Sequence, residues 1–282
     1  MRVGLVTCKT LPEPDPDAAP LDAALRARGH TPVMLPWDDA STQCDGLKRA
    51  QLDLIVVRSP WNYFTAADAF KDWIERANDI APVINGPSVV KWNMHKGYLL
   101  ELAAAGVAIV PTTLIKSADA SAAKDAIASY GDVVIKPAIG AGSFGAGRFK
   151  NNEASALDHA TKLATGRDVL IQPYLAGFEY PGERSLVWIN GEWTHAIRKQ
   201  PRFAGESESV DSGEPPTEAE LAVADAAIRA VPHKIHYARA DLVETESGVV
   251  LSELELMEPS LFFDHSATAL TRFIAMIESV AM

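Results

Sequence analysis

A lysine followed by a glycine-rich run is the feature of this sequence with the clearest chemical meaning. Residues 133–148 read Val-Val-Ile-Lys-Pro-Ala-Ile-Gly-Ala-Gly-Ser-Phe-Gly-Ala-Gly-Arg. Lys136 follows three β-branched residues that favour a strand, and the glycines allow the backbone to bend sharply and to approach a ligand closely. A lysine beside bare amide donors suits the oxygens of a polyphosphate. We therefore interpret this stretch as a phosphate-binding hairpin, with Gly142, Ser143 and Gly145 at its tip.

The spacing of Gly140, Gly142 and Gly145 also fits the GxGxxG fingerprint of dinucleotide-binding proteins. That fingerprint needs a helix that opens at the glycines and an acidic residue about 20 positions later. Here residues 147–150 favour a return strand, and the corresponding later window has no carboxylate. A Walker lysine would follow its glycines, whereas Lys136 precedes them. The phosphate hairpin is the better interpretation, with an ordinary flexible hairpin as the simpler alternative.

Two strand-like segments near the end of the chain carry three carboxylates. Period-two alternation places Arg239 and Asp241 on one face of the first segment, and Glu253 and Glu255 on one face of the second. Three carboxylates on neighbouring strands would repel one another unless a cation lay among them. Mg²⁺ takes oxygen ligands and commonly bridges carboxylates to nucleotide phosphates. We therefore predict a magnesium site, while the alternative is that one or two of these side chains simply face water.

A third group of candidates follows the third strand pattern of the chain, where the sequence continues with Arg-Ser-Pro-Trp-Asn-Tyr. In open α/β sheets, ligands meet the loops beyond the carboxyl ends of the strands. An arginine, a serine and two aromatic residues there could grip a carboxylate or another small polar group. A structural loop with its tryptophan in the core is an equally good alternative. The candidate substrate-binding residues are Arg58, Ser59, Trp61 and Asn62.

Composition limits the class of protein. The chain has 282 residues, of which 48% are apolar and 22% charged, which is typical of a soluble globular protein with two or three lobes. The net charge of −11 argues against a nucleic-acid surface, and neither a membrane-spanning run nor a signal-peptide pattern is visible. The cysteines, Cys8 and Cys44, form no paired motif. We expect a cytoplasmic protein that binds small molecules, with no nucleic acid or membrane as partner.

Strand and helix patterns at the beginning of the chain predict a small parallel α/β lobe. Strands are expected at 2–7, 31–35 and 52–57, with a helix over 21–28 between the first two. Another helix is expected over 66–77. We place a lobe boundary at the Pro-Val-Ile-Asn-Gly-Pro run that follows.

The middle of the chain combines helices with the glycine-rich hairpin. One long helix over 88–105 carries Lys96, and shorter helices are expected over 121–129 and 153–164. The segment 168–175 is strand-like but contains a proline, so we expect it to leave the sheet and connect two lobes. Its free backbone donors and acceptors are what an adenine edge needs.

The remaining segments predict a hairpin, a loop and closing helices. Alternating segments over 183–189 and 192–198 flank an Asn-Gly pair, which predicts a type I′ turn. The second segment leads into Arg198 and Lys199, two adjacent cations. Residues 200–216 lack periodicity and predict a mobile loop. Two further helices are expected, over 217–231 and 267–280.

Four separate motifs follow one another along the chain. In order they are Lys96, Lys136 with its glycine hairpin, the Gln172–Leu175 connector, and Asp241 with Glu253 and Glu255. This order resembles the ATP-grasp superfamily in its glutathione-synthetase-like or RimK-like branch, from about residue 91 to the end of the chain. Within that branch, the Arg-Ser-Pro-Trp-Asn-Tyr loop and the Glu-Leu-Glu-Leu-Met-Glu-Pro-Ser ending look most like the cycloserine-forming ligases, which close O-ureidoserine into a ring.

The resemblance implies an α/β protein with the α+β ATP-grasp fold, in which a small N-terminal parallel lobe precedes two α+β lobes that clasp ATP. The corresponding domains are an N-terminal α/β domain at 1–88, a central lobe with the glycine-rich hairpin at 89–175, and a C-terminal lobe with the metal-binding carboxylates at 176–282. Dimers are common in this family, so a homodimer is an expected assembly.

The resemblance also implies roles for the candidate residues. The ATP-binding set comprises Lys96, Lys136, Gly142, Ser143, Gly145, Gln172, Tyr174, Leu175 and Glu183, with the lysines on phosphates, the connector on adenine and Glu183 on the ribose hydroxyls. The catalytic set comprises Arg198, Lys199 and Arg239, which would stabilise the transferred phosphoryl group or an anionic intermediate. Asp241, Glu253 and Glu255 would hold two Mg²⁺ ions, although the usual family ending is Glu-x-Asn and Glu255 replaces the asparagine.

The reaction implied by the resemblance is ATP-dependent ligation of a carboxylate to an amine. A substrate carboxylate attacks the γ-phosphate of ATP, and a nitrogen nucleophile then displaces phosphate from the acyl phosphate, within one amino-acid-like molecule in the cycloserine-forming branch. In such a reaction, the protein mainly positions the reacting groups and stabilises the charge on the transferred phosphoryl group. The alternatives are a small-molecule kinase on the same fold, which would leave phosphate on its product, and a non-catalytic ATP-binding module.

Overall fold

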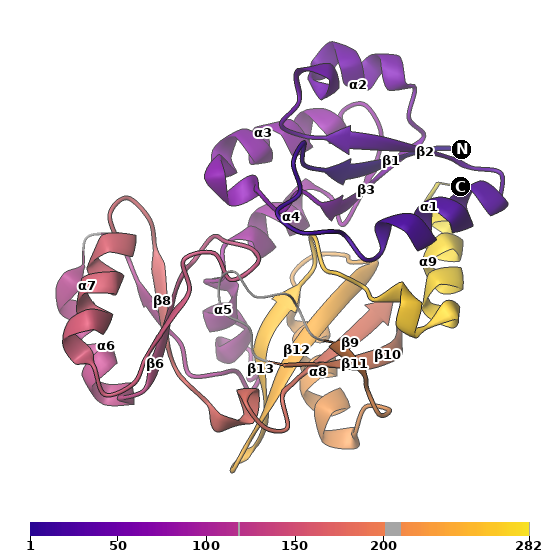
Figure 1. Cartoon of the computed structure of the whole chain (residues 1–282). Coiled ribbons are helices and arrows are strands. Elements are labelled where there is room, and N and C mark those ends of the chain that lie inside the picture. Colours follow the sequence, from indigo (N-terminus) through magenta and orange to yellow (C-terminus); the bar gives the residue numbers. More distant parts are fainter. Residues whose placement is uncertain (118, 201–209, 282) are drawn as a thin grey trace.

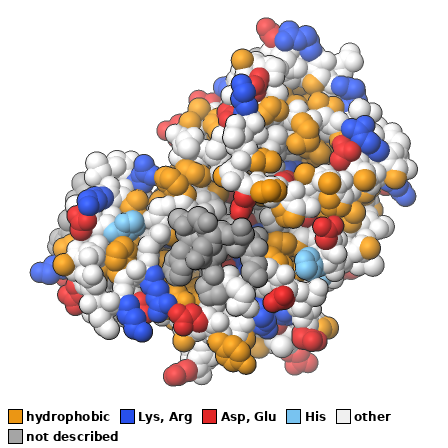
Figure 2. All heavy atoms as spheres, viewed as in Figure 1, with side chains coloured by type: hydrophobic (Ala, Val, Ile, Leu, Met, Phe, Trp, Pro, Cys, Tyr) orange, Lys and Arg blue, Asp and Glu red, His pale blue; other side chains and the backbone are white. Residues whose placement is uncertain are grey.

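Three sheets form the framework of the protein (Figure 1). The computed structural model describes residues 1–117, 119–200 and 210–281. A parallel four-stranded sheet comes first, followed by two antiparallel sheets of four and five strands, which confirms the predicted fold class. Within these residues, no helix is long and apolar enough to cross a membrane. Acidic and basic side chains are interspersed over the face of the molecule drawn in Figure 2.

The N-terminal lobe is a parallel sheet between two layers of helices. Its elements are β1 (Arg2–Thr7), α1 (Ala18–Ala27), β2 (Thr31–Pro36), α2 (Cys44–Ala50), β3 (Leu54–Ser59), α3 (Ala67–Asn78) and β4 (Val83–Ile84). The strand order is β2-β1-β3-β4, and all six residues of β3 are buried, as expected for a parallel strand covered on both faces. Helices α2 and α3 cover one face of the sheet.

The other face of this sheet is covered from both ends of the sequence. Helix α1 contributes Leu21 and Leu25, and the last helix, α9 (Ala267–Val280), contributes Phe273 and Ile277 to the same buried cluster. Figure 1 shows α9, in yellow, lying beside α1. The core of the N-terminal lobe is therefore completed by a helix that is remote in sequence.

The predicted long helix over 88–105 is wrong in one respect, because the structure divides it into α4 (Pro87–Met94) and α5 (Tyr98–Ala104). His95 has an extended backbone, with φ −100° and ψ 109°. The backbone N–H of Lys96 donates to the carbonyl of Ala138, 2.7 Å away, on the segment that leads into the glycine hairpin. A hydrogen bond to the neighbouring lobe thus replaces one within the helix, and it places Lys96 in the break.

The central lobe is an antiparallel sheet with two helices on one face. Its elements are β5 (Thr113–Ile115), α6 (Ala120–Tyr130), β6 (Val133–Pro137), β7 (Gly147–Phe149), α7 (Glu153–Leu163) and β8 (Val169–Pro173), in the strand order β5-β8-β6-β7. The predicted hairpin is confirmed, since β6 pairs with β7 in antiparallel fashion. Ile135 and Ile171 pack against the helices, whereas Lys136 and Gln172 point by alternation to the opposite face.

The C-terminal lobe is an antiparallel sheet of order β11-β10-β9-β12-β13. Its elements are β9 (Glu183–Ile189), β10 (Glu192–Lys199), β11 (Val210–Ser212), α8 (Glu218–Ala230), β12 (Tyr237–Thr245) and β13 (Gly248–Glu255). Asn190 and Gly191 join β9 to β10 with φ angles of 46° and 95°, as the predicted Asn-Gly turn requires.

The predicted loop over 200–216 needs a correction. Val210–Ser212 forms the edge strand β11, paired with residues 197–199 of β10. A strand of three residues is too short to show periodicity in the sequence. It is held in the sheet by its hydrogen bonds to β10. Residues 201–209 of that predicted mobile loop lie outside the described residues.

The outer edge of β13 pairs with backbone at Leu251, through a short parallel bridge to Ile109, and further along it is capped by side chains. The hydroxyl of Tyr98 accepts from the backbone N–H of Leu254 at 2.9 Å. The side-chain amide of Asn93 donates to the carbonyl of Leu254 at 2.7 Å and accepts from the N–H of Leu256 at 2.8 Å. Asn85 donates to the carbonyl of Leu256 at 2.8 Å. Helices α4 and α5, together with Asn85 just before α4, thereby satisfy backbone groups at the end of β13 that would otherwise be unpaired.

The capping of β13 predicts that single substitutions of the capping residues lower the free energy of unfolding. Asn93→Ala should lower the free energy of unfolding by about 2–4 kcal/mol, because it leaves two buried backbone groups without partners. Tyr98→Phe removes a single acceptor and should cost about 1–2 kcal/mol. Urea unfolding followed by circular dichroism measures both variants. Equal, negligible losses would contradict the capping role.

Candidate active site

A cavity of about 780 Å³ is lined by residues from all three lobes. The glycine-rich hairpin and the connector after β8 contribute one wall, and Pro12, Trp61 and Phe64 of the N-terminal lobe contribute another. Charged side chains of the C-terminal sheet complete the lining. The volume lies within the range of ordinary small-molecule sites.

The hairpin tip contacts the N-terminal lobe across the cavity. Gly142, Ser143 and Gly145 have φ angles of 57°, 59° and 68°, a left-handed backbone that glycine adopts without strain. Between them, the ring of Phe144 stacks on that of Phe64, with centroids 4.2 Å apart and an angle of 25° between the planes. The tip is therefore held against the wall that faces it.

Two lysines converge on Glu253. The ammonium of Lys96 lies 2.6 Å from one oxygen of Glu253 and donates to the carbonyl of Gly140 at 2.9 Å. The ammonium of Lys136 lies 3.9 Å from the other oxygen. Burial and the charge of Lys96 lower the pKa of Lys136, while the two lysines lower the pKa of Glu253 against the opposing effect of burial. This end of the cavity is the part best suited to phosphate oxygens.

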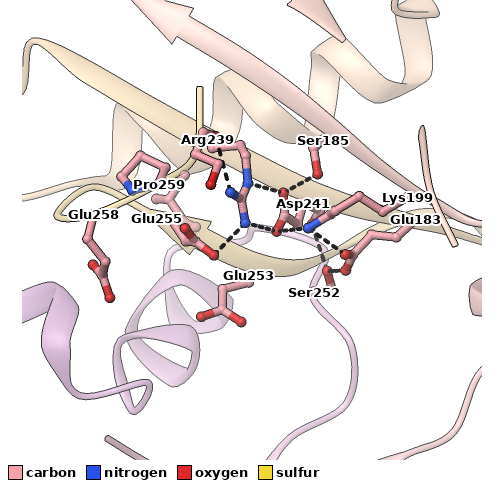
Figure 3. A network of polar contacts seen from close by, with 12 residues as sticks. Glu183, Ser185, Lys199, Arg239, Asp241, Ser252, Glu253, Glu255, Glu258 and Pro259 are labelled. Atoms are coloured by element: carbon pink, nitrogen blue, oxygen red, sulfur yellow. Dashed lines mark hydrogen bonds and ion pairs between the residues drawn. The ribbon is translucent and has the colours of Figure 1, made fainter. Parts of the chain in front are cut away.

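Asp241 is the centre of the polar network in Figure 3. The guanidinium of Arg239 meets its two oxygens at 2.8 and 2.9 Å. The ammonium of Lys199 lies 2.8 Å from one of these oxygens, and the hydroxyl of Ser185 donates to the other at 2.6 Å. Although burial opposes ionisation, Arg239 and Lys199 hold the pKa of Asp241 well below its usual range. Asp241 is therefore a charged, fully engaged carboxylate.

Both cations of this network also hold a second carboxylate. Arg239 donates to Glu255 at 2.5 Å. Lys199 lies 2.9 Å from Glu183, which also accepts from the hydroxyl of Ser252 at 2.6 Å. In Figure 3 these side chains point toward one another from neighbouring strands. The network thus joins the predicted catalytic, metal and ribose residues into one cluster.

Negative charge exceeds positive charge among the described residues that line the cavity. The carboxylates are Glu13, Glu183, Asp241, Glu253, Glu255 and Glu258, whereas the cations are Lys96, Lys136, Lys199 and Arg239. Burial, together with Asp241 and Glu253, raises the pKa of Glu255 to about 8 despite Arg239. Burial likewise raises the pKa of Glu258 to about 7. A divalent cation would relieve this imbalance.

The donor set fits magnesium that is shared with a phosphate. In the described part of the chain, no three His, Cys, Asp or Glu side chains stand together as a metal cage. Magnesium at a nucleotide needs only one or two carboxylates, because phosphate and water supply its other oxygens. Glu253 and Glu255 offer such oxygens, whereas both oxygens of Asp241 are already engaged by cations.

Most of the predicted site residues line this single cavity. They are Lys96, Lys136, Gly142, Ser143, Gln172, Tyr174 and Glu183 from the ATP-binding set, Lys199 and Arg239 from the catalytic set, Asp241, Glu253 and Glu255 from the metal set, and Trp61 from the substrate set. The individual roles given to these residues stay predictions.

Two connector residues have fixed positions. The side-chain amide of Gln172 donates to the hydroxyl of Thr112 at 2.8 Å. The guanidinium of Arg148 lies 3.3 Å from the centre of the Tyr174 ring and is itself paired with Asp132 at 2.8 Å. These contacts hold the connector before any ligand binds.

Other predicted residues lie behind the described cavity wall. Arg198 donates to the carbonyls of Pro181 and Gly182 at 3.1 and 3.3 Å, on the face of β10 opposite to Lys199. Leu175 precedes a short 3₁₀ turn. The carbonyl of Gly145 contacts the ring of His159 at 2.9 Å.

The predicted substrate segment begins inside β3, because Arg58 and Ser59 are the last residues of that strand rather than loop residues, and the segment is mostly engaged in internal contacts. Arg58, which is only 2% exposed, pairs with Asp17 at 3.0 Å and donates to the carbonyl of Pro259. The hydroxyl of Ser59 donates to that of Thr7, and Asn62 bonds to Trp37 and Asp38. Of the four predicted substrate-binding residues, these three lie away from the described lining of the cavity.

Glu258 is a cavity residue that the alternation argument missed. It lies in the turn after β13, where period two no longer applies, and the indole of Trp61 donates to its carbonyl at 3.1 Å. Its side chain has the hydroxyl of Tyr63 as a polar neighbour. The signal available in the sequence was its place in the Glu-Leu-Glu-Leu-Met-Glu-Pro-Ser run.

Comparisons with known proteins match the whole chain. The family model of the N-terminal domain of D-cycloserine synthetase DcsG matches residues 3–85. The cycloserine biosynthesis protein DcsG of Streptomyces lavendulae is 31% identical over 279 residues, which cover 92% of each chain. The crystal structure of D-cycloserine synthetase DcsG covers 100% of both chains, with 28% identity and a TM-score of 0.89.

A more distant structure supports the fold. The ATP-grasp ligase PsnB, complexed with a phosphomimetic variant of its minimal precursor, Mg and ADP, matches 97% of this chain and 98% of its own, with a TM-score of 0.65 and 18% identity. The resemblance stated from the sequence motifs is confirmed by these matches. The chain belongs to the D-cycloserine synthetase DcsG family of ATP-grasp ligases, enzymes that form C–N bonds.

Proposed function

We propose that this ligase closes an amino-acid derivative of the O-ureidoserine type into the cycloserine ring, by forming a C–N bond within one molecule. The observation that carries the proposal is the likeness to DcsG over the whole chain, including the N-terminal lobe that forms one wall of the cavity. A substrate wall that is shared with that relative supports a shared substrate class.

The proposed reaction has two steps. The substrate carboxylate attacks the γ-phosphate of ATP, which gives an acyl phosphate and ADP. The nitrogen bonded to the side-chain oxygen then attacks the acyl carbon, loses its proton and expels inorganic phosphate. The ring closes, and its carbamoyl group can leave afterwards as isocyanic acid, when the bond from the ring nitrogen to the carbamoyl carbon breaks and one hydrogen of the carbamoyl NH2 passes to the ring nitrogen. Every atom comes from the substrate and ATP, so the protein contributes positioning and charge.

The described side chains suit these steps. Lys96 and Lys136 are placed to hold phosphate oxygens, and the stack of Phe144 on Phe64 closes the hairpin over the cavity. Exclusion of water protects an acyl phosphate from hydrolysis. Arg239 and Lys199 present positive charge for the tetrahedral intermediate.

Magnesium belongs to this proposal. The PsnB complex contains Mg and ADP, and the surplus of carboxylates in the cavity supports the same cofactor here, with Glu253 and Glu255 as its protein ligands. Bound magnesium would neutralise charge on the phosphates. The expectation that Asp241 joins them to hold two ions stays a proposal, as does a homodimer.

The test of the function is turnover of Mg·ATP with a panel of amino-acid-like carboxylates that includes O-ureidoserine. We expect release of phosphate and a product lighter than the substrate by one water, or by water and the carbamoyl group. Mass spectrometry identifies the product, and malachite green measures the phosphate. A phosphorylated product would instead make the protein a kinase.

The carboxylate assignment predicts a change in magnesium dependence. Glu253→Gln should weaken the binding of Mg·ADP by about tenfold or more, because a magnesium ligand becomes a neutral amide. In EDTA, ADP should bind at least as well as before, since Lys96 and Lys136 lose their competing partner. Calorimetric titration measures both, with the exposed Glu246→Gln as the control. Unchanged magnesium dependence in both Glu253→Gln and Asp241→Asn would show that the assignment is wrong.

The roles of Arg198 and Lys199, the adjacent cations of β10, can be distinguished by a matched pair of variants. Lys199→Met should lower kcat about 100-fold or more, because Lys199 lies in the cavity network. Among the described residues, Arg198→Met removes contacts to two backbone carbonyls outside the cavity network, and it should lower kcat far less. Steady-state kinetics with the substrate found above gives both values, and thermal melts verify folding. The opposite ranking would assign the catalytic charge to Arg198.

A further inference from the structure

One carboxylate of the cavity differs from the others in its partners. Glu183, Asp241, Glu253 and Glu255 each lie within 3 Å of a lysine or arginine. Glu258 has no ion pair with any lysine or arginine of the described chain, although it lines the same cavity. Against the effect of burial, Lys96 lowers the pKa of Glu258 through space, but no lysine or arginine among the described residues forms an ion pair with it, so a ligand cation can take that place.

The turn that carries Glu258 is rigidly held. Trp61 donates to the carbonyl of Glu258 at 3.1 Å, Arg58 to that of Pro259 at 3.0 Å, and Arg239 to that of Ser260 at 3.2 Å. The partners come from two lobes. Three consecutive carbonyls are thus fixed by side chains, so the Glu258 carboxylate is presented at a defined position.

Glu258 lies near enough to the phosphate end of the cavity for Lys96 to lower its pKa against the effect of burial, but no ion pair joins it to Lys96 or Lys136. Its neighbours Trp61 and Tyr63 belong to the N-terminal lobe, whereas the lysines that suit phosphate oxygens hold Glu253. Figure 3 shows the Glu258 side chain outside the network around Asp241. The cavity lining also includes Trp61, whose indole donates to the carbonyl of Glu258 and whose aromatic face favours a cation.

We propose that Glu258 binds the α-ammonium group of the amino-acid substrate and selects for substrates that carry one. The inference rests on the proposed function, because an O-ureidoserine-type substrate carries this ammonium beside the carboxylate that is activated. A buried ammonium needs an anionic partner, and Glu258 is a cavity carboxylate that forms no ion pair within the described chain. The aromatic wall would exclude water from the pair.

The test compares two ligands that differ only in the ammonium: O-ureidoserine and 3-(ureidooxy)propanoic acid. Calorimetry in the presence of magnesium and a non-hydrolysable ATP analogue gives their dissociation constants. The wild-type protein should prefer the amino compound by about 30-fold or more, since loss of one partner of a buried charge pair has effects of that size. In Glu258→Gln this preference should vanish, with binding of the des-amino compound and of the nucleotide little changed. Glu246→Gln, on the exposed turn before β13, is the matched control and should behave as the wild type.

Each other outcome has a defined meaning. Equal weakening of both ligands in Glu258→Gln would indicate a merely structural role and overturn the proposal. Loss of kcat with the preference intact would point to proton transfer and overturn it as well. If the wild-type protein turns over O-ureidoserine but shows no preference for the ammonium, only the assignment of Glu258 fails. If it neither binds nor turns over O-ureidoserine, the proposed function itself fails, and the assignment fails with it.

Discussion

The outer edge of β13 is the constraint on which the site depends. An edge strand carries backbone groups that need partners, and here Asn93, Tyr98 and Asn85 supply them. The same helices end and restart around Lys96, so the capping that fixes the strand also fixes this lysine. Glu253 and Glu255 lie on that strand. One set of neutral hydrogen bonds therefore sets the spacing between the lysines and the acidic side chains that they face.

The second organising feature is a row of buried charged side chains in which carboxylates and cations alternate. Lys199 lies between Glu183 and Asp241, and Arg239 between Asp241 and Glu255. Burying a charged side chain away from water costs free energy. A cation that contacts two carboxylates offsets part of this cost for all three groups. Carboxyl groups outnumber cations in this row, and the raised pKa of Glu255 reflects burial and the resulting repulsion, which an added cation would relieve. A nucleotide bound with its metal ion carries both negative and positive charge. One cavity lined by lysines and carboxylates can therefore accept it.

The sequence predicted the parts of the fold that local chemistry decides. The Asn-Gly turn and the glycine hairpin were recognised because their backbone needs are specific. The break at Lys96 was missed because its cause is a hydrogen bond to Ala138 in another lobe. Alternation placed the residues of β12 and β13 on the cavity side, but it gave no reason to choose between Arg198 and Lys199. Glu258 escaped notice because it lies in a turn, where no period applies.

The position of α9 has a consequence for the order in which the protein can fold during synthesis. Leu5 and Leu25 belong to a lobe that is made first, yet Phe273 and Ile277 complete their core. Until α9 leaves the ribosome, one face of the first sheet has apolar surface without its cover. The N-terminal lobe therefore gains its full stability only after the C-terminal lobe has been synthesised, and a fragment cut at the lobe boundary would carry an exposed apolar face prone to aggregation.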